Sequence, residues 1–88
     1  MPEFLVEIYF SRAAADVVAH SAESARIAAE ELTREGTPVR YLKSIFVPED
    51  ETCLMLYESS SADAVDEAAR RAGLQVDRVA AVSSEAGR

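Results

Sequence analysis

VRYLKSIFVPEDETCLMLYES, residues Val39 to Ser59, is the stretch that decides the fold. Branched and aromatic residues lie on either side of the acidic segment 48–51, which predicts two β-strands joined by a turn. We expect the first strand to end near Val47, because Pro48 cannot donate a hydrogen bond to a neighbouring strand and acidic residues favour turns.

The hairpin presents two sets of side chains, because successive residues of a strand point to opposite faces of the sheet. We expect an apolar set to lie in the core beneath helices: Leu42, Phe46, Leu54 and Leu56. The opposite set mixes aromatic, sulfur-containing and charged side chains, and we expect any function to lie there: Tyr41, Lys43, Met55 and Tyr57.

The rest of the chain predicts two more strands and two helices. Residues 3–10 alternate, with an apolar face made of Phe4, Val6, Ile8 and Phe10. A helical segment follows Ser11 and ends at Gly36, since no glycine or proline interrupts residues 14–35 and alanines recur at helical spacing. A second helix follows a serine cap at 60 or 61 and ends at Gly73, and residues 76–83 form a last short strand.

The order β-α-β-β-α-β predicts a ferredoxin-like α+β fold. This fold is a two-layer sandwich with both helices on one face of an antiparallel sheet. We expect a single domain over residues 1–83 and a flexible tail over residues 84–88. The uncovered sheet face would be an unusually large apolar patch on a monomer, so we expect a homodimer.

Charge and composition exclude several classes of function. The 88 residues include 16 acidic and nine basic side chains, for a formal net charge of −7. Nucleic acids and membrane surfaces are therefore not expected as partners, because an acidic surface repels phosphates and anionic lipids. We expect no membrane span and no signal peptide. The single cysteine, Cys53, allows no intrachain disulfide, which fits a cytoplasmic protein.

Several residues of the predicted open face could form a polar pocket. A ligand-binding interpretation makes Glu7 a base or ligand, Lys43 a cationic anchor and Tyr57 a hydroxyl donor, with Tyr41 and Met55 beside them. The alternative is a cross-strand pair of Glu7 and Lys43 within a packed interface, since paired charges beside aromatic rings are common at dimer surfaces.

His20 is the only histidine, and histidine is a frequent metal ligand and general base. Glu23 lies three residues further along the same helix, so the two side chains could form a weak surface metal site. The alternative is an ordinary surface histidine. Cys53 has no cysteine or histidine at ligand spacing, and no glycine-rich phosphate loop or nucleophile elbow occurs.

Three segments resemble a family of small bacterial proteins that are often described as nickel-binding: FLVE, RYLKSIFVPEDETCLMLYES and AVDEAARRAGLQVDRV. The resemblance covers about residues 2–82 and implies a ferredoxin-like fold and a homodimer. Glu7 and Tyr57 match the family pattern, whereas many members carry a histidine in place of Lys43 and a cysteine in place of Met55. A protonated lysine is a poor metal ligand and repels a cation, so we expect nickel to bind weakly at most.

These features predict a small, cytoplasmic, homodimeric binding protein without enzymatic activity, with nickel as the cofactor that the resemblance implies. Two alternatives stay open. One is a small-molecule-binding domain that uses Glu7, Lys43 and Tyr57. The other is a cofactor-free enzyme on the same open face, with Glu7 or His20 as its base. Such an enzyme needs a base with a perturbed pKa in a pocket that excludes water, and the sequence offers neither directly.

Overall fold

The computed structural model describes residues 1–83, and the tail predicted over residues 84–88 lies outside the described residues. Its elements are β1 (Glu3–Tyr9), η1 (Arg12–Val17), α1 (Val18–Arg34), β2 (Val39–Val47), η2 (Pro48–Asp50), β3 (Thr52–Ser59), α2 (Ala62–Arg71) and β4 (Val76–Val82). The two η elements are short 3-10 helices. The predicted order of strands and helices is confirmed, and with it the ferredoxin-like α+β fold.

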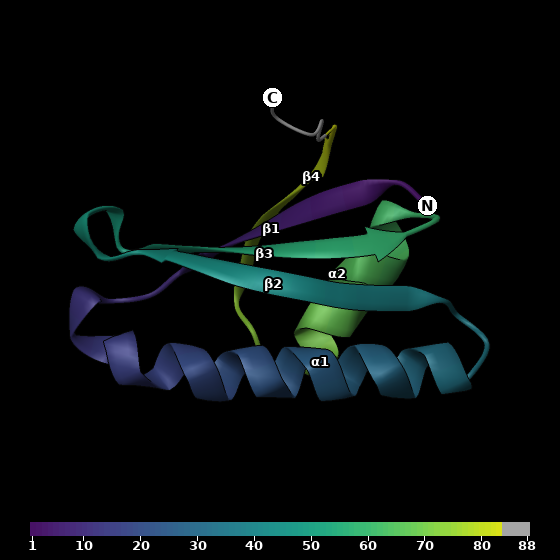
Figure 1. Ribbon diagram of the computed structural model, residues 1–88, viewed down its shortest axis with the longest axis horizontal. Helices are drawn as coiled ribbons and strands as arrows, with labels where there is room; N and C mark the ends of the chain where they lie inside the picture. The colour runs from purple at the N-terminus through teal and green to yellow at the C-terminus, as the bar shows by residue number, and fades with distance from the viewer. Residues whose placement is uncertain (84–88) are drawn as a thin grey trace, which may run out of the picture.

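The four strands form one antiparallel sheet in the order β2-β3-β1-β4. Both helices pack on the same side of this sheet; in the view of Figure 1, α1 lies below β2, and α2 passes behind β2 and reaches α1 at its lower end. Within residues 1–83, no helix or strand covers the opposite side, which we call the open face. No helix of the described residues is long and apolar enough to cross a membrane.

The core lies between the sheet and the helices. Alternate residues of β1 and β3 stand directly opposite each other in the antiparallel ladder and are at most 7% exposed: Phe4, Val6 and Ile8, paired with Tyr57, Met55 and Cys53. The helices cover these residues with buried alanines: Ala25, Ala28 and Ala29 of α1, and Ala64, Ala68 and Ala69 of α2. Such small side chains let the helices approach the sheet closely and leave room for the large residues of β3.

The ends of the helices follow local sequence signals. Ser61 caps α2, because its hydroxyl oxygen accepts a hydrogen bond of 3.2 Å from the backbone N–H of Ala64. Gly36 and Gly73 follow the two helices with φ angles of +105° and +84°, the left-handed conformation that glycine adopts without strain. The α-helix predicted to begin near Ser11 starts only at Val18, and a 3-10 helix precedes it.

The segment before α1 is held by the turn between β2 and β3. The backbone N–H of Arg12 donates to the carboxylate of Glu51 over 3.0 Å, and the N–H of Phe10 donates to the carbonyl of Glu51 over 2.9 Å. These contacts position the chain at the start of η1.

The structure corrects the predicted faces of β3. Met55 and Tyr57 are fully buried in the core, whereas Leu54 and Leu56 alternate with them and lie half-buried on the open face. The cause is the register with β1, whose apolar set faces the helices and therefore takes the opposite residues of β3 with it. Phe46 packs against the core as predicted.

A β-bulge in β2 moves Tyr41 to the helix side as well. Tyr41 stands opposite Tyr57, but Lys43 stands opposite Leu56, because the register with β3 shifts by one residue between them. Tyr41 and Lys43 therefore point to opposite faces although they are two residues apart. Leu42 occupies the bulge and stays half-buried, so its predicted place in the core is also wrong.

Candidate functional site

Rows of side chains cross the open face from β2 to β4. From one end of the sheet to the other, the pairing aligns Arg40, Glu58, Glu3 and Val82, then Lys43, Leu56, Leu5 and Ala80, and then Ile45, Leu54, Glu7 and Arg78. Four large aliphatic residues thus lie together in the middle, and we call them the apolar centre: Leu5, Ile45, Leu54 and Leu56. Charged side chains border the apolar centre on both sides.

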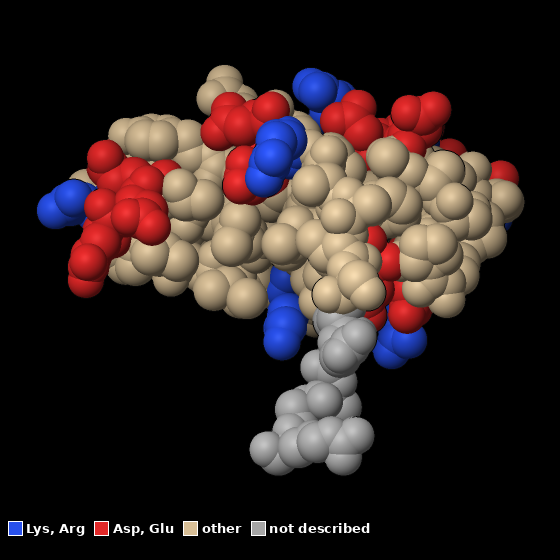
Figure 2. Space-filling model, turned by 90° about the horizontal axis from the view of Figure 1, so that it is seen from above, with Lys and Arg blue, Asp and Glu red and all other residues tan. Residues whose placement is uncertain are grey.

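Two pairs of opposite charges join neighbouring strands on the open face. Arg78 binds Glu7 through two hydrogen bonds, of 3.1 Å from Nε and 3.2 Å from Nη2. Arg40 reaches Glu58 only loosely, at 3.8 Å. Figure 2 looks onto the molecule from the side opposite α1 and shows uncharged side chains over much of the view, with acidic and basic groups between them. The open face therefore combines an apolar middle with a charged border.

The predicted polar pocket does not form within one chain. Of its five residues only Glu7 and Lys43 lie on the open face, because Tyr41, Met55 and Tyr57 point toward the helices. The predicted pair of Glu7 and Lys43 is also wrong. Glu7 forms its ion pair with Arg78, and Lys43 is exposed and has no ion pair among residues 1–83. Strand β3 separates Glu7 from Lys43.

The three displaced residues belong to a buried cluster instead. The rings of Tyr41 and Tyr57 meet edge to face with centroids 5.7 Å apart, and the hydroxyls of Tyr41 and Ser44 share a hydrogen bond. Among the described residues, the Tyr57 hydroxyl is the one buried side-chain polar atom without a hydrogen bond. Burial raises the pKa of Tyr57, and the negative charge of an ionised Tyr41 would raise it further.

Cys53 completes this cluster. Burial raises the pKa of its thiol, and a hydrogen bond to Ser44 opposes part of that shift. The thiol is fully inaccessible to solvent. Because the thiolate is the reactive form of cysteine, a buried thiol with a raised pKa has a structural role rather than a nucleophilic one.

The predicted metal pair, His20 and Glu23, lies on the exposed side of α1. Arg26 donates two hydrogen bonds to the Glu23 carboxylate, one of them over 3.0 Å from Nε to Oε1. This contact lowers the pKa of Glu23. A cation at His20 would therefore compete with the Arg26 guanidinium for the carboxylate. Within residues 1–83, no three histidine, cysteine, aspartate or glutamate side chains gather into a metal-binding group.

The predicted faces are wrong for two residues of the apolar centre, Leu54 and Leu56, although the hairpin contains a signal that places them correctly. A turn over residues 48–51 sets Val47 opposite Thr52, and hence Phe46 opposite Cys53. Directly opposite residues share a face. Placing Phe46 in the core therefore places Cys53 there too, and Leu54 follows on the open face.

Comparisons with known proteins agree with the fold. A family model described as nickel responsive protein SCO4226-like matches residues 4–82. The chain is also similar to the crystal structure of SCO4226 from Streptomyces coelicolor A3(2), with a TM-score of 0.79 and 20% sequence identity over 96% of this chain and 99% of that chain. No curated protein matches the chain. The resemblance to a small nickel-associated family is thus confirmed.

The described residues do not fit a nickel site within one chain. Nickel prefers imidazole nitrogen and thiolate sulfur, but the one histidine is isolated from Cys53, which is buried. Lys43 and Met55, which the resemblance compares with a histidine and a cysteine of relatives, lie on opposite sides of the sheet. These two positions therefore cannot act together on one ion within a single chain.

Proposed function

The chain belongs to the SCO4226-like family of nickel responsive proteins, and we propose that it is a non-enzymatic, cytoplasmic binding protein that forms a homodimer through the open face. One observation carries this proposal. The apolar centre places four large aliphatic side chains together on a face that no element of residues 1–83 covers. Burial of such a patch against a second copy would remove it from water.

The pattern of the open face supports a self-complementary contact. Interfaces combine an apolar core with a polar rim, and a two-fold axis brings the same patch of both copies together. An axis through the apolar centre would set aliphatic side chains against aliphatic side chains. The pair of Glu7 and Arg78 and the pair of Arg40 and Glu58 would then lie at the border of the contact.

Sedimentation velocity at micromolar concentration tests the homodimer, with two matched variants. Ile45 on the open face is 45% exposed, and Ile27 on α1 is 43% exposed. We expect Ile45→Lys to raise the dimer dissociation constant by about tenfold or more, since each tenfold step needs only about 1.4 kcal/mol. Ile27→Lys should leave the constant unchanged. A wild-type monomer, or equal effects of the two variants, would contradict the proposal.

For nickel, we propose weak binding that depends on His20, assisted by Glu23 when Arg26 releases it. Isothermal titration of the full chain with Ni²⁺ should give a small heat that His20→Ala removes. Glu23→Gln should weaken the same signal less, because Arg26 already holds the carboxylate. Tight, stoichiometric binding that survives His20→Ala would show that the ion uses ligands outside this pair.

A further inference from the structure

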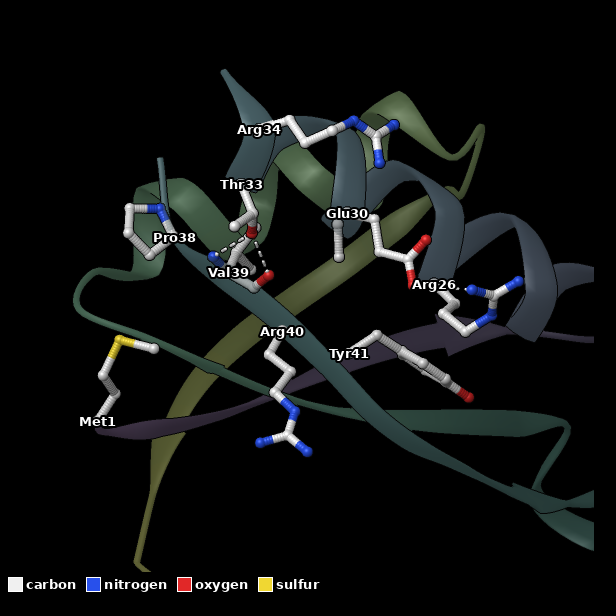
Figure 3. Close-up of a pocket in the computed structure, with 10 residues that line it drawn as sticks. Met1, Arg26, Glu30, Thr33, Arg34, Pro38, Val39, Arg40 and Tyr41 are labelled. Carbon is white, nitrogen blue, oxygen red and sulfur yellow. Dashed lines mark hydrogen bonds and ion pairs between the residues drawn. The ribbon is translucent and has the colours of Figure 1, made fainter. Parts of the chain in front are cut away.

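The two edges of the sheet differ in how their backbone groups are protected. Strand β2 is one edge, and α1 lies beside its first residues, with a cavity of about 620 Å³ between them (Figure 3). There the hydroxyl of Thr33 donates to the carbonyl of Val39 over 2.8 Å and accepts from its N–H over 3.1 Å. A bulge at Leu42 and the charged side chains of Arg40 and Lys43 also interrupt this edge. Such features protect an edge strand against pairing with another strand.

Strand β4 is the other edge and lacks this protection. Among residues 1–83, the backbone of β4 forms hydrogen bonds only with β1. After a bulge at Asp77 the pairing is regular from Arg78 to Val82, and residues 79–82 are all valine or alanine. Every second residue of an edge strand directs its N–H and C=O away from the sheet. The edge of β4 is therefore a template for another extended segment.

A cavity of about 280 Å³ lies beside this edge, between β4 and α2. It opens on the helix side of the sheet, because α2 forms one of its walls. Its volume is below the roughly 300–1,000 Å³ of small-molecule sites. The cavity therefore suits one long side chain of a segment that pairs with β4.

The charge that remains unpaired in this cavity is negative. Both arginines that line it are already bound: Nε of Arg70 donates to the two carboxylate oxygens of Asp66, over 3.0 and 2.9 Å, and Arg78 forms its ion pair on the open face. Two further carboxylates line the cavity, those of Asp63 and Asp77, and neither has an ion pair among residues 1–83. A cationic side chain in the cavity would complement them.

We propose that the edge of β4 binds an extended peptide as an added strand, with a lysine or arginine of the peptide in the cavity that Asp63 and Asp77 line. The net charge of −7 favours the approach of a basic segment. A second copy of the chain fits this edge less well, because it brings the same net charge and its own unpaired carboxylates instead of a cation. The edge and the apolar centre share no residue, so the inference does not depend on the homodimer.

Heteronuclear NMR of the nitrogen-15-labelled full chain tests the inference. The probe is the acetylated and amidated peptide Thr-Val-Thr-Lys-Thr-Val-Thr, whose lysine and valines share one face of an extended strand. We expect saturable shifts of backbone amides within residues 62–70 and 76–82. Norleucine in place of the lysine removes the charge, so binding should weaken about threefold or more. Added salt should weaken binding of the lysine peptide only.

Methylation of backbone nitrogens separates strand pairing from charge attraction alone. The N–H groups of alternate residues of an added strand face β4, and the others face away from the sheet. One peptide carries N-methyl groups on its two valines, and a second carries them on the two threonines beside the lysine. Only one of these two peptides should lose affinity, by about tenfold or more, because it lacks two hydrogen bonds to β4.

Four single variants of the chain locate the charge. Asp63→Asn and Asp77→Asn should each weaken binding of the lysine peptide about twofold or more. Asp50→Asn removes the same charge from the exposed turn between β2 and β3 and should leave the affinity unchanged at moderate salt. Arg70→Gln releases the carboxylate of Asp66 into the cavity, so it should strengthen binding, which a misfolded variant would not do.

Four results would overturn the inference. Shifts centred on residues 39–41 would place the peptide on the other edge of the sheet. Equal affinities of the two methylated peptides, or an equal effect of Asp50→Asn, would reduce the binding to non-specific charge attraction. Dissociation of the homodimer by the peptide would assign the edge of β4 to a second copy of the chain. The absence of saturable shifts at millimolar peptide would exclude the site.

Discussion

The helix side and the open face of the same sheet both carry large apolar side chains but meet different surroundings. Along β3 the two alternate: Met55 and Tyr57 have no solvent exposure, whereas Leu54 and Leu56 between them are half-buried. The first set is enclosed by the alanines of the helices, and the second has no cover from residues 1–83. The core of this sheet thus contains sulfur and aromatic side chains, whereas the leucines between them lie on a face that residues 1–83 leave uncovered.

The strongest test of this difference compares two truncations of neighbouring residues. Met55→Ala should lower the free energy of unfolding by about 2–5 kcal/mol, because it leaves a cavity in a closed core. Leu56→Ala should cost the monomer about 1 kcal/mol or less, since its side chain is already partly in water. Urea unfolding at a concentration below the dimer dissociation constant measures both. Equal losses would mean that the open face is part of the core.

The next test uses the dependence of stability on protein concentration. For a dimer, the free energy that association adds to the folded state grows by up to about 1.4 kcal/mol for each tenfold rise in concentration. We expect this dependence in the wild-type chain and in Met55→Ala. Leu54→Lys should abolish it, because a charge would enter the middle of the contact. Concentration dependence that persists in Leu54→Lys would move the interface away from the open face.

The sequence predicts the elements more reliably than the faces. Pro48, Gly73 and Ser61 act through their own backbone conformation or their nearest neighbours, so the turn, the end of α2 and its cap follow from local rules. The face of Tyr41 depends on a bulge, and no glycine or proline in VRYLKSIF marks its position. Local patterns carry no information on such register shifts.

The candidate site depends on pairing between strands that are far apart in the sequence, and local sequence patterns do not predict this pairing either. Glu7 meets Arg78, 71 residues away, because β4 pairs with the other edge of β1. The predicted partner, Lys43, lies beyond β3 on the opposite side. The cavity beside Thr33 has a similar origin, since it depends on how α1 lies over the edge of β2 and not on any motif.

A third test concerns the unpaired hydroxyl on the helix side. Tyr57→Phe removes a buried polar group without a partner, so the variant should be as stable as the wild type or more stable, by up to about 1–2 kcal/mol. Tyr41→Phe removes a hydroxyl that is bonded to Ser44 and should cost about 1 kcal/mol. Thermal unfolding of both variants checks the order. A marked loss in Tyr57→Phe would indicate that its hydroxyl has a partner, such as a bound water.

A fourth test exploits the titration of the buried cluster. Burial raises the pKa of the Cys53 thiol, so the folded chain keeps its proton at a pH where the unfolded chain, with a thiol pKa of about 8.5, loses it. The unfolded state then binds fewer protons, and stability must fall as the pH rises above about 8.5. Cys53→Ala should flatten this decline between about pH 8.5 and 9.5, before tyrosines ionise. An unchanged slope in the variant would assign the decline to other groups.

The smallest expected effect comes from the border of the open face and depends on whether that face is covered. Glu7→Gln breaks the bidentate contact with Arg78, whose side chain is 66% exposed, so in the monomer it should cost under about 1 kcal/mol. In a dimer that buries Glu7 and Arg78, the variant would leave the Arg78 charge unpaired and away from water. The loss in free energy of unfolding should then be larger. Unfolding of Glu7→Gln below and above the dimer dissociation constant separates the two. Equal losses at both concentrations would place the pair outside the contact and confine the interface to the apolar centre and the row that includes Arg40.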